Sequence, residues 1–392
     1  MDYFCILGGG GIRGVAYVGA LRALLEQNVN ITGYAGSSIG AVFTSLLAVG
    51  YSLDEIEHLF MNLKMDIFKD INFDFHKGFA LSRGEKFLLW IRDLIESKYY
   101  GEKYVKNEMP PVKFSDLDMH LIILSINLTD SSFKEFSRTI TPDAEIALAV
   151  RASVSMPGLY TPVFQGSDII VDGDLIKSWP LWRVSPNLRP SGSRILEFRL
   201  EDVQTDKKIN NGLDYLNAVY NTISGFATDF IIDLYSERDK FDYIKINSTD
   251  VRVLDFLLSN AKKQELIRVG YETTMEYFKE TLPKKRKKLF ENYYSIQLAL
   301  TRLKHELEVK NNVKSAYCVL AEIFMHLCEH KRYIDIDIYD VIVAFKDLFS
   351  RNYHISSFLF ISGYKLNDKS LVVREVEEII KMVSKKTLEL KT

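Results

Sequence analysis

The stretch FCILGGGGIRGVAYVGAL, residues 4–21, places four consecutive glycines between a short apolar run and a segment with helical spacing. The run before the glycines is rich in strand-forming residues, and after them Val15, Val18 and Leu21 recur at a helical interval. Glycine weakens regular elements because it loses the most conformational freedom on folding. Four glycines at a strand-to-helix junction therefore indicate that bare backbone is needed there for chemistry.

The segments that follow continue the alternation of strand and helix. NITGYAG at residues 30–36 predicts a second strand, and AVFTSLLAVG at residues 41–50 predicts a helix that ends at Gly50. Ser52 to Glu55 has the spacing of a capping box, which starts a third helix. Alternating strands and helices predict an α/β fold with a mostly parallel sheet, whose ligands bind beyond the carboxyl ends of the strands.

Composition bounds the class of protein. The chain has 392 residues, of which 47% are hydrophobic and 26% charged, so it is globular and large enough for a substantial core. A net charge of -2 does not imply bulk attraction to nucleic acid. Three cysteines form no disulfide framework, and no apolar run is long enough for a spanning helix. We expect a cytoplasmic protein that is soluble or held peripherally at a membrane.

The glycine loop partly matches a dinucleotide-binding pattern. Gly9, Gly11 and Gly14 fit G-x-G-x-x-G, but the acidic residue expected about 20 positions further on is absent. A phosphate cradle is also excluded, since no lysine followed by serine or threonine closes the loop. The loop must serve another purpose.

That purpose is suggested by a second motif. Gly36, Ser38 and Gly40 form G-x-S-x-G between a predicted strand and a predicted helix, which is the context of a nucleophile elbow. Ser37 lies out of register with the glycines, and the alternative for Ser38 is an ordinary helix-capping serine. We predict that Ser38 is the nucleophile of an ester hydrolase.

Such a nucleophile needs donors for the oxygen that becomes negative in the tetrahedral intermediate. Backbone N–H groups of the glycine loop and of the following helix N-terminus can supply them, so the predicted oxyanion hole comprises Gly9, Gly10, Gly11 and Ile39. For Arg13 three roles stay open: steadying the loop, attracting an anionic head group, or a surface arginine paired locally.

At this point the sequence resembles the patatin-like phospholipase family. The family's G-G-G-x-[RK]-G loop corresponds to Gly9 to Gly14 here, and its G-x-S-x-G elbow corresponds to Gly36 to Gly40. Its third motif, D-G-[GA], corresponds to Asp172-Gly173-Asp174, where the third residue departs from the usual small one. The motif-bearing part spans about residues 4–186.

The resemblance implies a three-layer α/β/α hydrolase with a Ser–Asp dyad. Asp172 would be the proton acceptor for Ser38 directly, and Arg13, Gly14, Gly36, Gly40 and Gly173 would support the motifs. The alternative for Asp172 is a turn residue, because Asp-Gly is a common turn signal. No metal and no organic cofactor is expected.

A hydrolase with a Ser, Asp, His triad is the rival mechanism. The histidines after Asp172 are His305, His326, His330 and His354, and those between elbow and aspartate include His58 and His76. None sits in an evident strand-end loop, so we favour the dyad. The aromatic stretch from Phe68 to Trp90 is a candidate rim or flap over an acyl-chain groove.

The character of the chain changes after residue 280. Five consecutive basic residues, Lys284 to Lys288, follow Pro283, which suggests a boundary between a hydrolase domain at 1–280 and a helical extension at 281–392. A solvated linker is our first interpretation of the basic run, before contact with anionic lipid or nuclear targeting. His326 and His330 share a helix face, but no third metal ligand is apparent.

The sequence therefore predicts a serine acyl hydrolase. The resemblance implies its substrates, glycerophospholipids or related lipids cleaved in the manner of a phospholipase A or lysophospholipase, with peripheral membrane contact. The alternative is a catalytically silent lipid-binding or scaffold protein on the same fold. Residues 281–392 could bind a regulatory partner or form a homo-oligomer.

Overall fold

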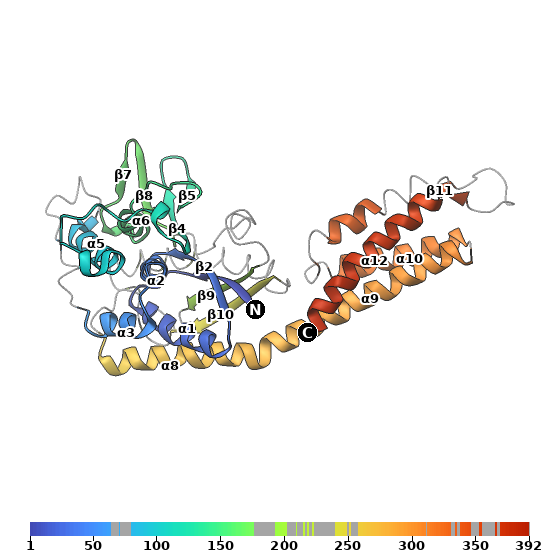
Figure 1. Ribbon diagram of the computed structural model, residues 1–392, viewed down its shortest axis with the longest axis horizontal. Coiled ribbons are helices and arrows are strands. Elements are labelled where there is room, and N and C mark those ends of the chain that lie inside the picture. The colour runs from blue at the N-terminus through green and yellow to red at the C-terminus, as the bar shows by residue number, and fades with distance from the viewer. Residues whose placement is uncertain are drawn as a thin grey trace. The chain divides into compact units, whose positions relative to one another are not determined.

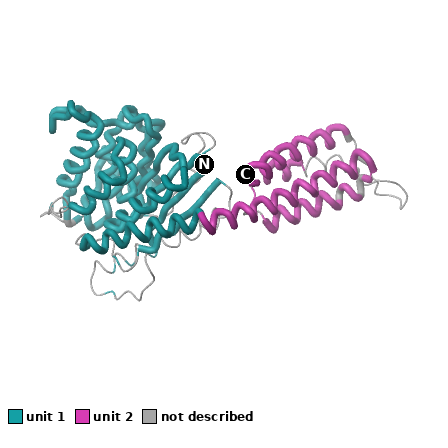
Figure 2. Tube along the Cα trace, turned by 60° about the horizontal axis from the view of Figure 1, so that its bottom comes forward, with its two compact units in different colours: residues 1–236, 240–278 teal, residues 237–239, 279–392 magenta. Residues whose placement is uncertain are grey.

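The computed structural model has two compact units (Figures 1 and 2), one comprising residues 1–236 and 240–278 and the other residues 237–239 and 279–392. The structure describes residues 1–63, 70, 80–175, 193–201, 209, 215, 218, 222, 240–248, 251, 258–310, 312–330, 334, 338–345, 353–354, 365–366 and 369–391. His76, residues 68–69 and 71–79 of the aromatic stretch and the end of the motif region, residues 176–186, lie outside them.

The first unit is organised around an eight-stranded sheet, seven strands of which follow the order β10-β9-β1-β2-β4-β8-β7, with β5 paired to β4. The parallel strands are β10 (Phe241–Asn247), β9 (Arg194–Glu201), β1 (Asp2–Leu7), β2 (Asn30–Ser37) and β4 (His120–Asn127). The strands paired antiparallel are β8 (Asp168–Asp172), β7 (Val163–Gln165) and β5 (Ser132–Ser137). The predicted α/β fold with a mostly parallel central sheet is confirmed.

The sheet register brings the motifs to one edge. Leu7 at the end of β1 pairs with Gly36, Ser37 at the end of β2 pairs with Leu124, and the next residue of β4, Ser125, pairs with Asp172. Strand β8 runs antiparallel to β4 but pairs only with the last three residues of β4, so Asp172 at the end of β8 still lies level with the carboxyl ends of the parallel strands. The glycine loop, the elbow and the aspartate therefore meet at the carboxyl edge of the parallel strands, as expected for this class of sheet.

Helices of the first unit follow from local signals. The glycine loop leads into the 3-10 turn η1 (Gly11–Val15), and Ser52 and Glu55 form the predicted capping box at the start of α3. The described α-helices of this unit are α1 (Ala16–Glu26), α2 (Ile39–Ala48), α3 (Leu53–Met61), α5 (Glu85–Tyr100), α6 (Ile146–Ser153) and α8 (Asn260–Glu276). A short parallel pair, β3 (Ala80–Ser82) with β6 (Gly158–Tyr160), adds a second small sheet.

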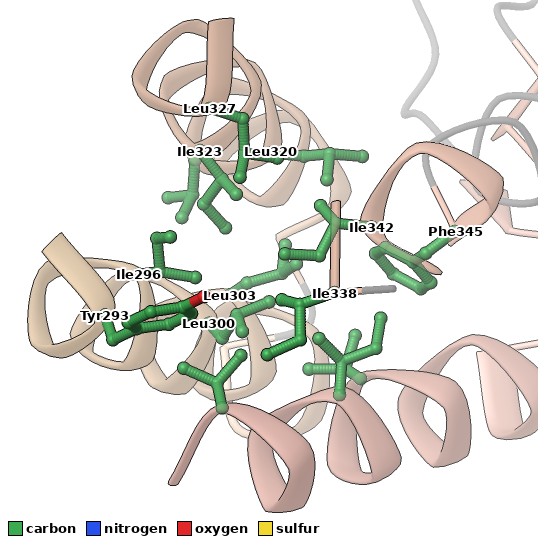
Figure 3. Close-up of a cluster of buried hydrophobic side chains, with 14 of the residues drawn as sticks. Tyr293, Ile296, Leu300, Leu303, Leu320, Ile323, Leu327, Ile338, Ile342 and Phe345 are labelled. Atoms are coloured by element: carbon green, nitrogen blue, oxygen red, sulfur yellow. The ribbon is translucent and has the colours of Figure 1, made fainter. Parts of the chain in front are cut away.

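The second unit is helical, which confirms the predicted helical extension. Its main helices are α9 (Leu282–Glu308), α10 (Val313–Glu329) and α12 (Lys369–Lys391), with residues 338–345 also helical and β11 (Tyr353–His354) pairing with β12 (Lys365–Leu366). Figure 3 shows side chains of α9, α10 and residues 338–345 pointing toward one another, among them Leu300, Ile323 and Ile342, each at most 1% exposed. This unit thus has an apolar core of its own.

The interpretation of the basic run as a linker is wrong. Lys284 to Lys288 lie in the first turns of α9, with Pro283 at its start, after a π-helical turn at Tyr277–Thr281. Lys284 and Lys287 form salt bridges with Glu280 and Glu291 one helical turn away. Proline is tolerated in the first turn of a helix because its missing N–H has no partner there, so Pro283 begins this helix instead of ending one.

Candidate active site

The turn around Ser38 has the geometry of a nucleophile elbow. Ser38 lies between β2 and α2 with φ 52° and ψ -125°, a conformation that costs free energy for a residue with a Cβ. The turn is closely packed, since a Cβ on Gly40 would lie 1.9 Å from the Leu7 carbonyl oxygen and one on Gly36 would lie 2.4 Å from Thr44 Oγ1. The two glycines of the motif are therefore sterically required.

The two predicted catalytic side chains are in direct contact. Ser38 Oγ donates a hydrogen bond to Asp172 Oδ2 at 2.8 Å, across 134 residues of sequence. Ser38 N donates to Ser153 Oγ at 3.0 Å, and Ser153 Oγ in turn donates to the Leu124 carbonyl at 2.6 Å. The hydroxyl thus sits within the range required of a nucleophile and its base.

Asp172 is placed in an environment that makes its carboxylate more basic. The residue is 1% exposed, and its Oδ1 accepts a hydrogen bond from Asp174 N at 2.7 Å. Burial, followed by the negative charge of Asp174, raises the pKa of Asp172 to about 8, although the hydrogen bonds from Asp174 N and Ser38 act in the opposite direction. A carboxylate with a raised pKa accepts a proton more readily once it is ionised.

Of the four predicted oxyanion-hole residues, two line the pocket and two pack against neighbouring side chains. Gly11 and Ile39 line the same pocket as Ser38 and Asp172. Gly9 lies against the Asp174 carboxylate, where a Cβ would come within 2.5 Å of Oδ2. Gly10 lies against Leu200, where a Cβ would come within 2.7 Å of Cδ1. The first pair therefore faces the reacting space, and the second pair lets the loop pack closely on its neighbours.

The remaining motif residues hold the loops together. Arg13 is 0% exposed, with Nε donating to the Gly10 carbonyl at 3.0 Å and Nη1 to Ser248 Oγ at 3.2 Å, so the surface-arginine alternative is wrong and the side chain steadies the loop. A Cβ on Gly14 would meet Ile39 Cγ1 at 2.6 Å, and one on Gly173 would meet the Leu124 carbonyl oxygen at 1.9 Å.

The serine and histidine alternatives are placed elsewhere. Ser37 is 0% exposed and its Oγ donates to Asp174 Oδ1 at 3.2 Å, so this hydroxyl does not reach the pocket. His58 is on α3, where its imidazole contacts Asn62, and His305, His326 and His330 belong to the helical unit. Within the described part of the chain, no histidine makes a hydrogen bond with Ser38 or Asp172.

Ser38 and Asp172 both line an apolar pocket. Its empty volume is about 600 Å³, including the part open to solvent. Phe87 and Trp90 of α5 belong to its wall, so the end of the predicted aromatic stretch does border the site. Other apolar lining residues come from several elements: Val42, Phe60, Leu63, Met156, Leu159 and Tyr160.

Three residues near the site carried no sequence signal. Ser153 bonds to Ser38 N, and Glu197 and Arg199 of β9 form a buried charge cluster with Asp174. The one related signal in the sequence is Asp174, the charged third residue of the D-G-D motif, because a buried carboxylate requires a compensating partner. In the described residues no group of three or more His, Cys, Asp or Glu side chains could hold a metal ion. None of the described helices combines the length and the apolar character needed to cross a bilayer.

Comparison with known proteins finds a family model that matches the part of the chain carrying this site. The family model described as Patatin-like phospholipase matches residues 5–182. Protein R571 of Acanthamoeba polyphaga mimivirus is 29% identical over 279 residues, which covers 69% of this chain and 91% of that protein. "Probable lipid hydrolase 463L" of invertebrate iridescent virus 6 is 27% identical over 178 residues, covering 45% of this chain and 61% of that protein.

Among solved structures, VipD from Legionella pneumophila is similar to this chain. The TM-score is 0.52 at 15% sequence identity, with 99% of this chain and 88% of that chain covered. At this identity the likeness concerns the fold alone.

Proposed function

The chain carries a patatin-like phospholipase domain over residues 5–182, and on that premise we propose that it cleaves ester bonds of glycerophospholipids or related lipids with a Ser38–Asp172 dyad. Membership of this family makes the chain a lipid acyl hydrolase. The dyad is supported above all by the 2.8 Å hydrogen bond between Ser38 Oγ and Asp172 Oδ2. We assign the activity to the phospholipase A or lysophospholipase type.

The reaction begins when Asp172 accepts the hydroxyl proton as Ser38 Oγ attacks the acyl carbon. Backbone N–H groups of the glycine loop and of Ile39 stabilise the negative oxygen of the tetrahedral intermediate, with Gly11 and Ile39 nearest the pocket. Asp172 then returns the proton to the leaving alcohol, which leaves an acyl-enzyme. Water, deprotonated by the same carboxylate, hydrolyses that ester and frees Ser38.

The pocket supports an acyl chain as the group that is recognised. Its wall is formed mainly by aliphatic and aromatic side chains, and Ser38 and Asp172 are among the lining residues. An apolar cleft with a few polar groups is typical of sites for apolar ligands. We therefore place the acyl chain among Phe60, Trp90 and Leu159, and the head group toward solvent.

A fluorophosphonate probe tests the nucleophile directly, since it phosphonylates activated serines. We expect the full-length protein to be labelled and Ser38→Ala not to be. Ser37→Ala is the matched control, because Ser37 is the adjacent hydroxyl but is buried, and it should retain labelling. Release of fatty acid from phosphatidylcholine and lysophosphatidylcholine vesicles should follow the same pattern. Labelling that persists in Ser38→Ala would refute the assignment.

The silent scaffold remains the competing proposal, and the same experiment decides it. A scaffold would bind lipid vesicles but leave both the probe and the ester bonds unchanged. The buried, hydrogen-bonded Asp172 favours the enzyme, because burying an ionisable carboxylate costs free energy that a binding protein has no need to retain.

For the helical unit we propose a role in contacts with other molecules. It has its own apolar core, and α9 carries exposed apolar side chains one turn apart, Tyr294 at 46% and Leu298 at 54%. If these side chains mediate self-association, light scattering of the full chain will give a multimer that Leu298→Glu disrupts. A monomer in both cases would leave partner binding as the role to test.

Peripheral membrane contact is a separate proposal. It is supported by the basic start of α9, where the side chains of Lys284 and Lys287 are each 78% exposed. Binding to anionic vesicles should decrease with salt and in Lys284→Glu/Lys287→Glu, whereas binding to neutral vesicles should not change. Equal binding to both kinds of vesicle would argue against it.

A further inference from the structure

Three charged side chains are buried beside the aspartate loop. Arg199 Nη1 donates to Asp174 Oδ1 at 2.8 Å and Arg199 Nε donates to Glu197 Oε1 at 2.6 Å. The exposed fractions of these side chains are only 3–4%. One guanidinium thus serves two carboxylates in an interior where an unpaired charge is strongly unfavourable.

Asp174 connects this cluster to all three catalytic motifs. Its backbone N–H donates to Asp172 Oδ1 at 2.7 Å, and its Oδ1 also accepts a hydrogen bond from Ser37 Oγ at 3.2 Å. On the glycine loop, Gly9 packs directly on the Asp174 carboxylate, and a Cβ on Gly8 would come within 2.9 Å of the Arg199 side chain. Asp174 therefore contacts Asp172 through its backbone N–H, and the elbow and the glycine loop through its carboxylate.

We propose that Asp174, held by Arg199, is a positioning residue of the hydrolytic site that orients the Asp172 carboxylate and supplies a neighbouring negative charge. The inference rests on the proposed Ser38–Asp172 dyad. It gives a physical role to the third residue of the D-G-D motif, where a small residue would leave Arg199 with Glu197 alone.

Two consequences follow from the geometry. The ion pair with Arg199 fixes the Asp174 side chain and, through it, the backbone N–H that bonds to Asp172. The negative charge of Asp174 also disfavours ionisation of Asp172 and so, after burial, raises the pKa of Asp172. Removing this charge should therefore lower the pH at which the base becomes active.

Of the other titratable groups around Asp172 that the structure describes, all but Tyr160 make hydrogen bonds with the protein. Helix α2 and the three β4 residues paired with β8 carry no charged side chain. The groups on the other surrounding elements are Arg13 on η1, Tyr17 on α1, Arg151 on α6, Tyr160 on β6, and Glu197 and Arg199 on β9. Arg151 donates to the Gly84 carbonyl and to Ser155 Oγ, and Tyr17 donates to the Gly8 carbonyl. A pH effect of the Asp174 charge can thus be measured against a fixed background.

The test compares Asp174→Asn with Glu197→Gln in the full-length protein. Both substitutions keep the side-chain shape, and each removes one of the two carboxylate charges that pair with Arg199. Only Asp174→Asn removes the charge that lies beside Asp172. The readout is the rate of fluorophosphonate labelling from about pH 5 to about pH 10. We expect the midpoint to move down by about one pH unit in Asp174→Asn and to stay unchanged in Glu197→Gln.

Asp174→Glu separates charge from position. It keeps the negative charge but moves it by one methylene, so the midpoint should stay while the maximal rate falls at least about threefold. Should Asp174→Asn fail to fold, this variant carries the test. A wild-type midpoint in Asp174→Asn, an equal shift in Glu197→Gln, or a wild-type rate in Asp174→Glu would overturn the inference.

Failure of the inference is distinguishable from failure of the dyad. If the dyad is wrong, Asp172→Asn will label with the wild-type rate and pH midpoint, whatever the Asp174 variants do. If the dyad is right and the inference wrong, Asp172→Asn will lose labelling while Asp174→Asn retains the wild-type profile.

Discussion

The elbow around Ser38 and the loop around Asp172 each bring one oxygen to the same pocket, but different physical forces hold them. The elbow is uncharged, and it depends on glycines that admit close contact with neighbouring backbone, such as Gly40 against the Leu7 carbonyl. The aspartate loop shares one such contact, at Gly173, but it also carries two carboxylates, one of which, Asp174, pairs with Arg199 on a different strand.

The comparison shows that close packing determines the conformation of the elbow, whereas charge compensation also determines that of the aspartate loop. Steric requirements of a tight turn are met by residues close in sequence, so they appear as a short motif. Charge compensation in the interior is met by residues close in space, because an ion pair can join any two strands that lie near one another.

The largest effect on activity is expected from a substitution of Asp172, the proposed base. Asp172→Asn keeps the hydrogen-bonding shape but cannot accept the proton, so kcat/KM for a p-nitrophenyl ester should fall by about 10²–10⁴-fold. The fold should be retained, as circular dichroism and an unchanged or higher Tm would indicate. Activity within about threefold of wild type would mean that another group serves as the base.

The elbow can be broken by sterics alone. Gly40→Ala places a Cβ 1.9 Å from a backbone carbonyl that cannot move without displacing β1, so we expect a loss of about 3 kcal/mol in the free energy of unfolding. Denaturant titration measures this loss. Gly173→Ala, with the same 1.9 Å contact at Leu124, should cost a similar amount.

Gly101→Ala is the matched control for these two substitutions. Gly101 has φ +56° but no atom within 4 Å of its Cβ position, so it reports backbone strain without a clash and should cost about 1–2 kcal/mol. Equal losses for Gly40→Ala and Gly101→Ala would show that the close contact is unimportant.

The motifs made of local shape were predictable from the sequence. The motif of Gly36, Ser38 and Gly40 predicted the sharp turn between strand and helix, and the alternation of strands and helices predicted the mostly parallel sheet. Asp172 was predicted only through resemblance to a family, because Asp-Gly by itself is an ordinary turn signal. Glu197 and Arg199 were not predicted, since nothing in β9 indicates that it lies beside residue 174. The basic run was misread because a proline can begin a helix as well as end one.

The charge of Asp172 should also appear in the stability of the protein. Its pKa is raised to about 8 in the folded state, so between its usual pKa of 3.8 and that value the folded chain keeps a proton that the unfolded chain releases. The stability contributed by this group is therefore fully present at low pH and is lost as pH rises to about 8, at about 1.4 kcal/mol per pH unit.

Asp172→Asn does not titrate, so its stability relative to wild type should improve steadily between about pH 5 and about pH 8. Thermal melts at several pH values give the comparison. Ser38→Ala retains the carboxyl group and should follow the wild-type trend. A difference between Asp172→Asn and wild type that is constant with pH would mean that Asp172 is ionised throughout this range.

The smallest effect is expected at Ser153, which holds the elbow by a hydrogen bond instead of by packing. Ser153 Oγ accepts from Ser38 N and donates to the Leu124 carbonyl, so Ser153→Ala removes both bonds and should cost about 1–3 kcal/mol, because buried groups lose their partners. Because Gly36 and Gly40 still enforce the turn, kcat should fall by less than about tenfold. Ser45→Ala is the control, since Ser45 is equally buried on α2 but bonds only within its own helix, to the Val42 carbonyl. A loss of kcat in Ser153→Ala as large as that in Asp172→Asn would mean that the elbow, like the aspartate loop, depends on its polar contacts more than on its shape.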